Sequence, residues 1–203
     1  MTSSLFVISG NFSGAGKTSI LDAALKRFPL SKKVITCTTR LPRVHLNEKD
    51  GVHYRFLTRE DFAARSQASA FAEEKRDFGT GNWYGVLRED IRNAAKGDAP
   101  AFLVVELQGV RTLQEELGDA NYVFIEAPIG ELRARLEKRG DAAEEIENRM
   151  RIVEEERVLL REVRIDRIIV NRDGALEAAI EEFATFVSAH MSRHKDATKE
   201  PSA

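Results

Sequence analysis

Near its beginning the chain reads Leu5-Phe6-Val7-Ile8-Ser9-Gly10-Asn11-Phe12-Ser13-Gly14-Ala15-Gly16-Lys17-Thr18-Ser19. The apolar run at residues 5–9 predicts a buried strand, and apolar side chains at helical spacing predict a helix over residues 18–28. Between them, small residues allow successive backbone N–H groups to surround a phosphate at the positive end of the helix. The stretch therefore predicts a phosphate-binding loop, or P-loop, within an α/β fold.

The residues of this loop that we expect to contact ATP are Asn11, Phe12, Ser13, Gly14, Ala15, Gly16, Lys17, Thr18 and Ser19. Lys17 is expected to reach the β- and γ-phosphates, and the Thr18 hydroxyl to hold Mg²⁺. Asn11 occupies the position of the first glycine of the pattern, and asparagine adopts left-handed backbone conformations more readily than most residues with a side chain. The alternative is a strand-to-helix turn that binds no ligand.

Strand and helix patterns alternate along the rest of the chain. Apolar runs predict strands at residues 34–38, 52–57, 101–107, 122–126 and 167–170. Helical spacing predicts helices at residues 59–66, 88–96, 130–139, 143–162 and 176–190, and another after Gly109. The polar stretch at residues 39–93 interrupts this order and predicts an inserted subdomain, in which residues 67–87 form a loop with short extended pieces. The alternation itself is typical of a parallel sheet covered on both faces, so we expect a three-layer α/β sandwich.

The composition is that of an ordinary globular protein, since 42% of the residues are hydrophobic, 32% are charged and the net charge is −2. The longest apolar run, residues 101–105, is far shorter than the roughly 20 residues of a membrane-spanning helix. With 31 basic and 33 acidic residues, binding of nucleic acid through bulk charge is not indicated. The single cysteine, Cys37, excludes an internal disulfide and suits a reducing compartment. We expect a cytoplasmic monomer or homodimer without nucleic-acid or membrane partners.

Four later segments carry further polar groups: Thr36-Cys37-Thr38-Thr39-Arg40-Leu41-Pro42-Arg43 with Tyr54 after it, Gly81-Asn82-Trp83-Tyr84-Gly85, Val105-Glu106-Leu107-Gln108-Gly109, and the stretch from Arg133 through Arg139 and Arg149 to Asn171. The guanidinium groups of Arg40 and Arg43 stand three residues apart beside hydroxyls, which suits bidentate binding of a phosphate dianion. Glu106 follows an apolar run, where a carboxylate linked to Mg²⁺ is expected. Arg133 and Arg135 lie among glutamates and are expected to be structural.

In this order, and over about residues 4–190, the segments resemble the guanylate kinase family. The resemblance implies that ATP, with Mg²⁺, phosphorylates a nucleoside monophosphate such as GMP or dGMP. It implies catalytic roles for Lys17, Arg139 and Arg149. It also implies that Asn171 lies beside the adenine of ATP. The residues that would bind the acceptor nucleotide are Thr36, Arg40, Arg43, Tyr54, Glu73, Tyr84 and Glu106.

The same resemblance divides the chain into a core, a nucleotide-binding insert and a lid. The core is expected at residues 4–38, 94–138 and 164–190, and the subdomain that binds the nucleoside monophosphate at residues 39–93. A helical lid is expected at residues 139–163, and a frayed tail at residues 191–203.

Two positions that would read the base depart from the family pattern. Val86 stands where the family has a hydroxyl, and Lys75 stands at the interval where it has a glutamate. Glu73 or Glu74 could serve if the intervening loop is one or two residues longer. These departures leave open a kinase of other base specificity, or a sugar-phosphate kinase like ribose 1,5-bisphosphate phosphokinase. A binding module without catalysis is the alternative of another class.

Overall fold

The computed structural model of the chain describes residues 3–10, 14–44, 47–77 and 79–199. Its main sheet has the strand order β2-β7-β1-β8-β9, and every neighbouring pair in it is parallel. These strands are β1 (Leu5–Gly10), β2 (Lys32–Lys33), β7 (Ala101–Val104), β8 (Asn121–Glu126) and β9 (Arg167–Val170). The central strand β1 therefore delivers its carboxyl end, and the loop after it, to the middle of the sheet edge.

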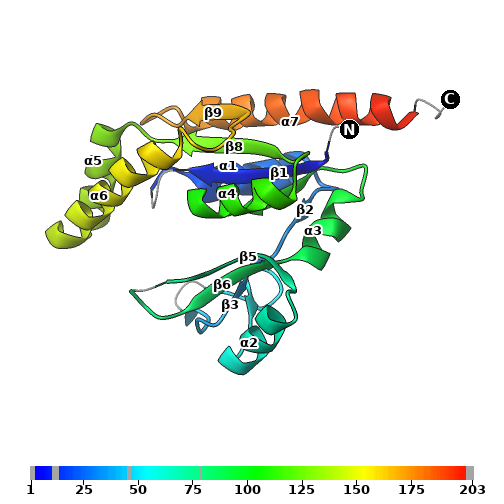
Figure 1. Cartoon of the computed structure of the whole chain (residues 1–203). Coiled ribbons are helices and arrows are strands. Elements are labelled where there is room, and N and C mark those ends of the chain that lie inside the picture. The colour runs from blue at the N-terminus through cyan, green and yellow to red at the C-terminus, as the bar shows by residue number, and fades with distance from the viewer. Residues whose placement is uncertain (1–2, 11–13, 45–46, 78, 200–203) are drawn as a thin grey trace.

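Both faces of this sheet are buried, as the side chains of β1 show. Leu5 and Val7 point into one apolar cluster, while Phe6 and Ile8 point into another. The helices α3 (Arg88–Ala95) and α4 (Leu107–Glu116) contribute to the first cluster, and α1 (Lys17–Arg27) and α7 (Leu176–Lys199) to the second. Figure 1 shows α4 and α7 on opposite sides of the sheet. The predicted three-layer α/β sandwich is confirmed.

A second sheet lies below the first in Figure 1, with the order β4-β3-β6-β5. Its strands are β3 (Cys37–Thr38), β4 (Arg55–Phe56), β5 (Phe71–Arg76) and β6 (Trp83–Leu87), and helix α2 (Arg59–Gln67) packs beside them. The ring of Phe62 in α2 stacks on Phe71 in β5, with ring centroids 4.4 Å apart. This apolar contact gives the second sheet a small core of its own.

Helices α5 (Ile129–Arg139) and α6 (Ala143–Leu159) form a hairpin that projects from one end of the molecule (Figure 1). The chain turns between them at Gly140, which ends α5 with a φ of 84°. An exposed ion pair between Arg133 and Glu147 joins the two helices. None of the helices in the described ranges is long and apolar enough to cross a membrane.

Several boundaries differ from the sequence predictions. The single strand expected at residues 34–38 is wrong, because β2 ends at Lys33 in the main sheet and β3 begins at Cys37 in the second one. The loop expected at residues 67–87 is also wrong, since it contains β5 and β6. The strand expected to reach residue 107 ends at Val104, and Glu106 is the N-cap of α4. Helix α7 continues to Lys199, beyond the expected end at residue 190.

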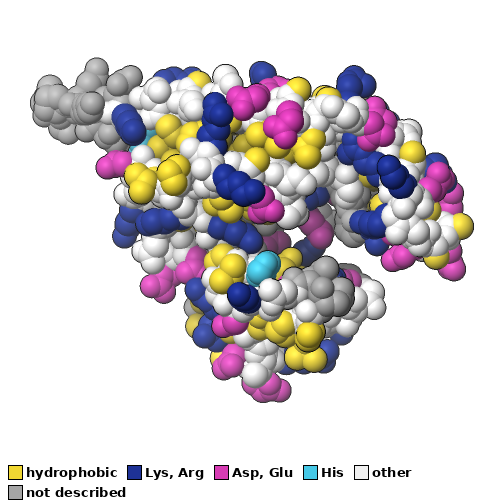
Figure 2. Space-filling model, turned by 180° about the vertical axis from the view of Figure 1, so that it is seen from behind, with side chains coloured by type: hydrophobic (Ala, Val, Ile, Leu, Met, Phe, Trp, Pro, Cys, Tyr) yellow, Lys and Arg dark blue, Asp and Glu magenta, His cyan; other side chains and the backbone are white. Residues whose placement is uncertain are grey.

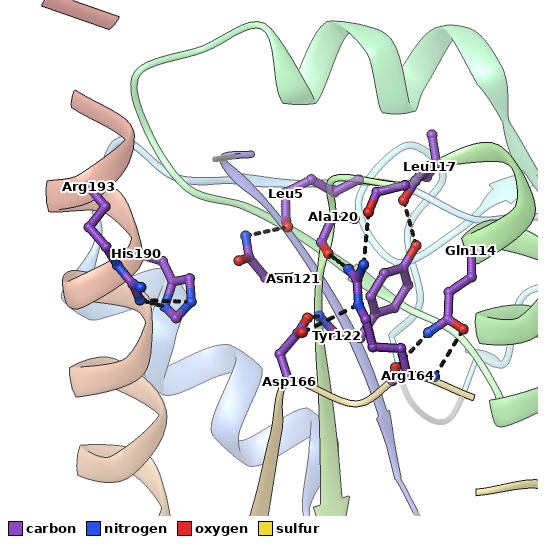
Figure 3. A network of polar contacts seen from close by, with 11 residues as sticks. Leu5, Gln114, Leu117, Ala120, Asn121, Tyr122, Arg164, Asp166, His190 and Arg193 are labelled. Carbon is purple, nitrogen blue, oxygen red and sulfur yellow. Dashed lines mark hydrogen bonds and ion pairs between the residues drawn. The ribbon is translucent and has the colours of Figure 1, made fainter. Parts of the chain in front are cut away.

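A polar network fixes the chain where it returns from α6 to the main sheet (Figure 3). The Arg164 guanidinium donates to the carbonyl oxygens of Gly118 at 2.9 Å and Ala120 at 2.6 Å. It also lies over the ring of Tyr122, 4.9 Å from the centroid. Asp166 accepts a hydrogen bond from the backbone N–H of Tyr122 at 2.8 Å. The segment before β9 is thus held to β8 and to the turn that precedes it.

Candidate active site

The loop after β1 turns through two left-handed glycines into α1. Gly14 has a φ of 101° and Gly16, the N-cap of α1, has a φ of 91°. The Nζ of Lys17 donates to the carbonyl of Gly10 at 3.1 Å, so its side chain folds back over the loop. Burial lowers the pKa of Lys17, and the carboxylates of Glu156 and Glu106 partly offset this effect. The predicted ATP contacts Asn11, Phe12 and Ser13 lie outside the described residues.

The rest of the predicted loop begins the helix. Ala15 is buried, while Thr18 and Ser19 are exposed on the first turn of α1. No acidic residue stands in that turn, and the described residues contain no cluster of His, Cys, Asp or Glu that could hold a metal ion. Thr18 lies on the first turn of α1, at the positive end of that helix, and its role in holding Mg²⁺ stays a prediction.

Asn171, which directly follows β9, forms a hydrogen bond with the backbone of the phosphate loop. Its side-chain nitrogen donates to the carbonyl of Ala15 at 2.8 Å, and its backbone N–H donates to the carbonyl of Glu126 at 2.8 Å. A Cβ on Gly16 would overlap this same side-chain nitrogen. Asn171 is buried, and its contact with the adenine of ATP stays a prediction.

Arg135 joins the same structure from α5 in a structural role, as the sequence predicted, although its contact with the phosphate loop was not predicted. Its guanidinium donates to the carbonyl oxygens of Gly14 at 3.2 Å and Asn171 at 2.8 Å. It also forms an ion pair with Asp173 at 2.7 Å. No local pattern of the sequence indicates this contact, because Arg135 and Gly14 are 121 residues apart.

A group of polar side chains between β3 and β4, here called the cationic cluster, is centred on Arg40 and also contains Arg43, Glu48 and Tyr54. The Arg40 guanidinium forms a bidentate pair with Glu48 at 2.8 and 3.0 Å, and it lies over the ring of Tyr54, 5.1 Å from the centroid. Glu48 also accepts from the backbone N–H of Arg43 at 2.7 Å. The Arg40 guanidinium lowers the pKa of Glu48 to about 2. Glu48 was not predicted as a site residue.

The remaining predicted acceptor residues extend this cluster toward the hairpin of β5 and β6. The ring of Tyr84 in β6 lies 6.3 Å from that of Tyr54. Thr36 precedes β3, and its carbonyl accepts from the backbone N–H of Arg55 at 2.9 Å. Arg43 is exposed at the edge of the cluster. The structure thus brings Arg40, Tyr54 and Tyr84 into one group.

Glu73 lies on the inner face of β5, directly opposite Val86 in the antiparallel register. Its carboxyl group is buried against Gly109 of α4, whose added Cβ would be 3.1 Å from Oε1. Burial raises the pKa of Glu73 to about 7, and the Lys75 ammonium acts in the opposite direction. Glu74 is exposed on the other face, where it accepts from the Ser66 hydroxyl at 2.8 Å. Of the two glutamates left open by the sequence, only Glu73 faces the site.

Glu106 connects this hairpin to the phosphate loop. Its carboxylate forms an ion pair with Lys75 of β5, and its charge also acts on Lys17. The Lys75 ammonium lies 5.9 Å from the centre of the Tyr84 ring. An acid at the start of α4 thus interacts both with the phosphate loop of the main sheet and with the hairpin of the second sheet.

The two arginines predicted for the lid meet at Asp141. The Arg139 guanidinium binds the Asp141 carboxylate through two nitrogens, and Arg149 Nε lies 3.7 Å from the same carboxylate. Arg149 also pairs with Glu145 at 3.2 Å, one turn earlier on α6. These arginines lower the pKa of Asp141. Figure 2 shows the molecular surface hollowed between the part that carries α5 and α6 and the part that carries the second sheet.

The fold and this site together define a class of protein. A strand in the middle of a parallel sheet, followed by a left-handed glycine turn, a lysine and a helix N-terminus, is the arrangement of the P-loop proteins that bind nucleotides. The guanylate kinase family model matches residues 2–190, and the chain belongs to this family.

Individual relatives agree with this assignment. The chain is 33% identical over 198 residues to a guanylate kinase of Vibrio parahaemolyticus, covering 96% of this chain and 92% of that protein. It is 34% identical over 197 residues to a guanylate kinase of Syntrophus aciditrophicus, covering 96% and 91%. The crystal structure of guanylate kinase from Anaplasma phagocytophilum is similar in fold, with a TM-score of 0.68, 24% identity and coverage of 92% and 85%.

Proposed function

We propose that this protein transfers the γ-phosphoryl group of ATP to GMP or dGMP, giving ADP and the nucleoside diphosphate. The observation that carries the proposal is the placement of Glu106, which pairs with Lys75 of the β5–β6 hairpin and whose charge acts on Lys17 in the phosphate loop. The donor and acceptor sites are therefore adjacent. Relatives that match nearly the whole chain are named guanylate kinases, which supports the same assignment.

The donor site consists of the loop after β1 and the start of α1. The backbone N–H groups around Gly14 and Gly16 and the ammonium of Lys17 would hold the phosphates of ATP. Thr18 would hold Mg²⁺, which supplies charge neutralisation for the β- and γ-phosphates when it is bound. Asn171 and Arg135 keep the loop in its conformation through the carbonyls of Ala15 and Gly14. The small residues, the lysine and the hydroxyl of this loop are therefore the residue types that bind the phosphates of ATP and its Mg²⁺.

The acceptor site consists of the cationic cluster and the hairpin of β5 and β6. The Nε of Arg40 is buried and has no hydrogen-bond partner within the described residues, although both terminal nitrogens bind Glu48. Such an unpaired donor suits a phosphate oxygen. Arg43, Thr36, Tyr54 and Tyr84 would complete the phosphate site, and the Glu73 carboxylate would accept from the base.

Transfer requires the hollow between these parts to close. An oxygen of the GMP phosphate attacks the γ-phosphorus, and the bond from that phosphorus to the β–γ bridging oxygen breaks. Arg139 and Arg149, now held by Asp141, would move onto the transferring phosphoryl group. In this account residues 139–163 act as the lid and residues 39–93 as the subdomain that binds GMP. The oligomeric state and the cytoplasmic location stay predictions.

The test is a coupled assay of ADP release with a panel of acceptors: GMP, dGMP, AMP, CMP, UMP, IMP and ribose 1,5-bisphosphate. We expect GMP and dGMP to give the highest kcat/KM. A kinase of other base specificity would prefer another nucleotide, and a sugar-phosphate kinase would prefer ribose 1,5-bisphosphate. ADP release with none of these acceptors would leave only a binding module and would contradict the proposal.

A further inference from the structure

Four side chains share the inner face of the hairpin formed by β5 and β6. The register pairs Glu73 with Val86 and Lys75 with Tyr84, and residues two apart on a strand point to the same side. This face looks toward α4, because Glu73 contacts Gly109 and Lys75 pairs with Glu106. The opposite face, with Trp83, packs against Phe62 of α2.

The hydrogen-bonding character of this face is asymmetric. An ionised Glu73 carboxylate only accepts hydrogen bonds, Val86 forms none, and the Lys75 ammonium only donates. Lys75 is also the cation whose charge favours the ionised form of Glu73. A ligand edge that fits this face must therefore present N–H donors to Glu73 and, beside them, an acceptor to Lys75.

The present partner of Lys75 is easy to exchange. The side chains of Lys75 and Glu106 are 28% and 49% exposed to solvent. Ion pairs as exposed as this one contribute only about 0–1 kcal/mol to stability. Lysine has a long, flexible side chain with three donors, so its ammonium can reorient toward a ligand while its Cα stays in the strand. Glu106 would then be available to the bound nucleotide.

Guanine presents the required edge. Its N1–H and exocyclic amino group are donors, and its 6-oxo group beside them is an acceptor, whereas adenine carries an amino donor at that position. Building on the proposed function, we propose that Lys75 determines base specificity by donating a hydrogen bond to the 6-oxo group of guanine while Glu73 accepts from the adjacent N–H groups. Lys75 exchanges the Glu106 carboxylate for the base when GMP binds.

The test compares GMP with 6-thio-GMP, in which a poorly accepting sulfur replaces the 6-oxo oxygen. The wild-type protein is expected to prefer GMP by ~10-fold or more in kcat/KM. Lys75→Met is expected to raise the KM for GMP by ~10- to 100-fold with little change in kcat. The same variant should prefer GMP over 6-thio-GMP by no more than ~2-fold in kcat/KM. Arg76→Met removes the same charge from the exposed, opposite face of β5 and should change neither the KM for GMP nor the preference for GMP over 6-thio-GMP.

Two results would overturn the assignment of Lys75. One is a wild-type protein that has the same kcat/KM for GMP and 6-thio-GMP. The other is a Lys75→Met variant whose kcat/KM falls by the same factor for both acceptors, as a purely structural role of Lys75 would require. Lys75→Ala provides a second variant without a donor if circular dichroism shows that the methionine variant does not fold. Failure of the proposed function is separate, since the wild-type protein would then release no ADP with GMP at all.

Discussion

The side chain of Asn171 fills the space beside the α-carbon of Gly16, 155 residues earlier in the chain. Its amide donates to Ala15 in the same turn, so the end of β9 holds the phosphate loop after β1 in its left-handed path. The two strands lie in the same parallel sheet, on either side of β8. The sheet order, rather than the local sequence, brings these residues together.

Gly16→Ala should therefore weaken both folding and nucleotide binding. A residue with a Cβ costs about 1–2 kcal/mol in the left-handed region, and here the added atom also overlaps Asn171. We expect the free energy of unfolding to fall by more than ~2 kcal/mol and the Kd for ATP, measured by calorimetry, to rise at least ~10-fold. Gly174→Ala is the matched control, because Gly174 has a φ of 73° but no atom within 4 Å of its added Cβ. Equal effects of the two substitutions would contradict the role given to Asn171.

Glu73→Gln should stabilise the unliganded protein at alkaline pH. The folded-state pKa of about 7 is above the ordinary 4.5, so the stabilising contribution of protonated Glu73 is complete below pH 4.5 and is lost as the pH rises through 7. The variant should match the wild type in acid and exceed it by about 3 kcal/mol above pH 8, in urea unfolding curves at a series of pH values. Glu74→Gln, the same substitution on the exposed face of the strand, is the matched control. A difference that does not vary with pH would rule out burial of the Glu73 carboxyl as its cause.

Arg40→Lys should impair the acceptor site selectively. Lysine keeps the charge but loses the planar fork that binds Glu48 through two nitrogens and leaves Nε for the substrate. Loss of one charge-assisted hydrogen bond is worth about 1.5–3 kcal/mol, so the KM for GMP should rise ~10- to 100-fold while the KM for ATP is unchanged. Arg59→Lys, at the exposed start of α2, is the control. Steady-state kinetics that show equal increases for ATP and GMP would place Arg40 outside the acceptor site.

Arg164→Ala should lower stability without altering catalysis. The substitution removes two hydrogen bonds to backbone carbonyls and the contact with the Tyr122 ring, far along the sheet from the phosphate loop. Because half of the side chain is exposed, we expect a loss of about 2 kcal/mol in thermal or urea unfolding. The kcat and both KM values should stay within ~2-fold of the wild type, since nothing in the site changes. A large fall in kcat would show instead that this network controls the lid.

The sequence predicted four strands of the main sheet, β1, β7, β8 and β9, because each contains an apolar run and the P-loop pattern locates β1. It missed β2, which is formed by two lysines. It failed in the second sheet for physical reasons. Strand β5 carries four consecutive charged residues, 73–76, and a bulge between Phe71 and Glu73 breaks its alternation. Strands β2 and β3 are each two residues long and belong to different sheets, so the apolar segment at residues 34–38 predicted one strand where the chain passes from one sheet to the other.

For the site, the phosphate loop and the arginines were predictable as motifs, but their partners were not. The pattern left Glu73 and Glu74 equivalent, and only the register of β5 on β6 turns Glu73 inward. The pairing of Lys75 with Glu106 joins two elements that are far apart in sequence, and the same holds for Arg135 and the carbonyl of Gly14. Contacts of this kind depend on how the two sheets and α5 are placed, which no local pattern encodes.

The most direct test of the central claim follows the phosphoryl group itself. With ATP labelled at the γ-phosphate, the wild-type protein should convert GMP to labelled GDP, one molecule for each ADP released, and Lys17→Met should reduce this rate by at least ~10³-fold while retaining its circular dichroism spectrum. Lys26→Met, at an exposed lysine later in α1, should behave as the wild type. Labelled inorganic phosphate in place of labelled GDP, or an undiminished rate in Lys17→Met, would contradict a phosphoryl transfer from the P-loop to GMP.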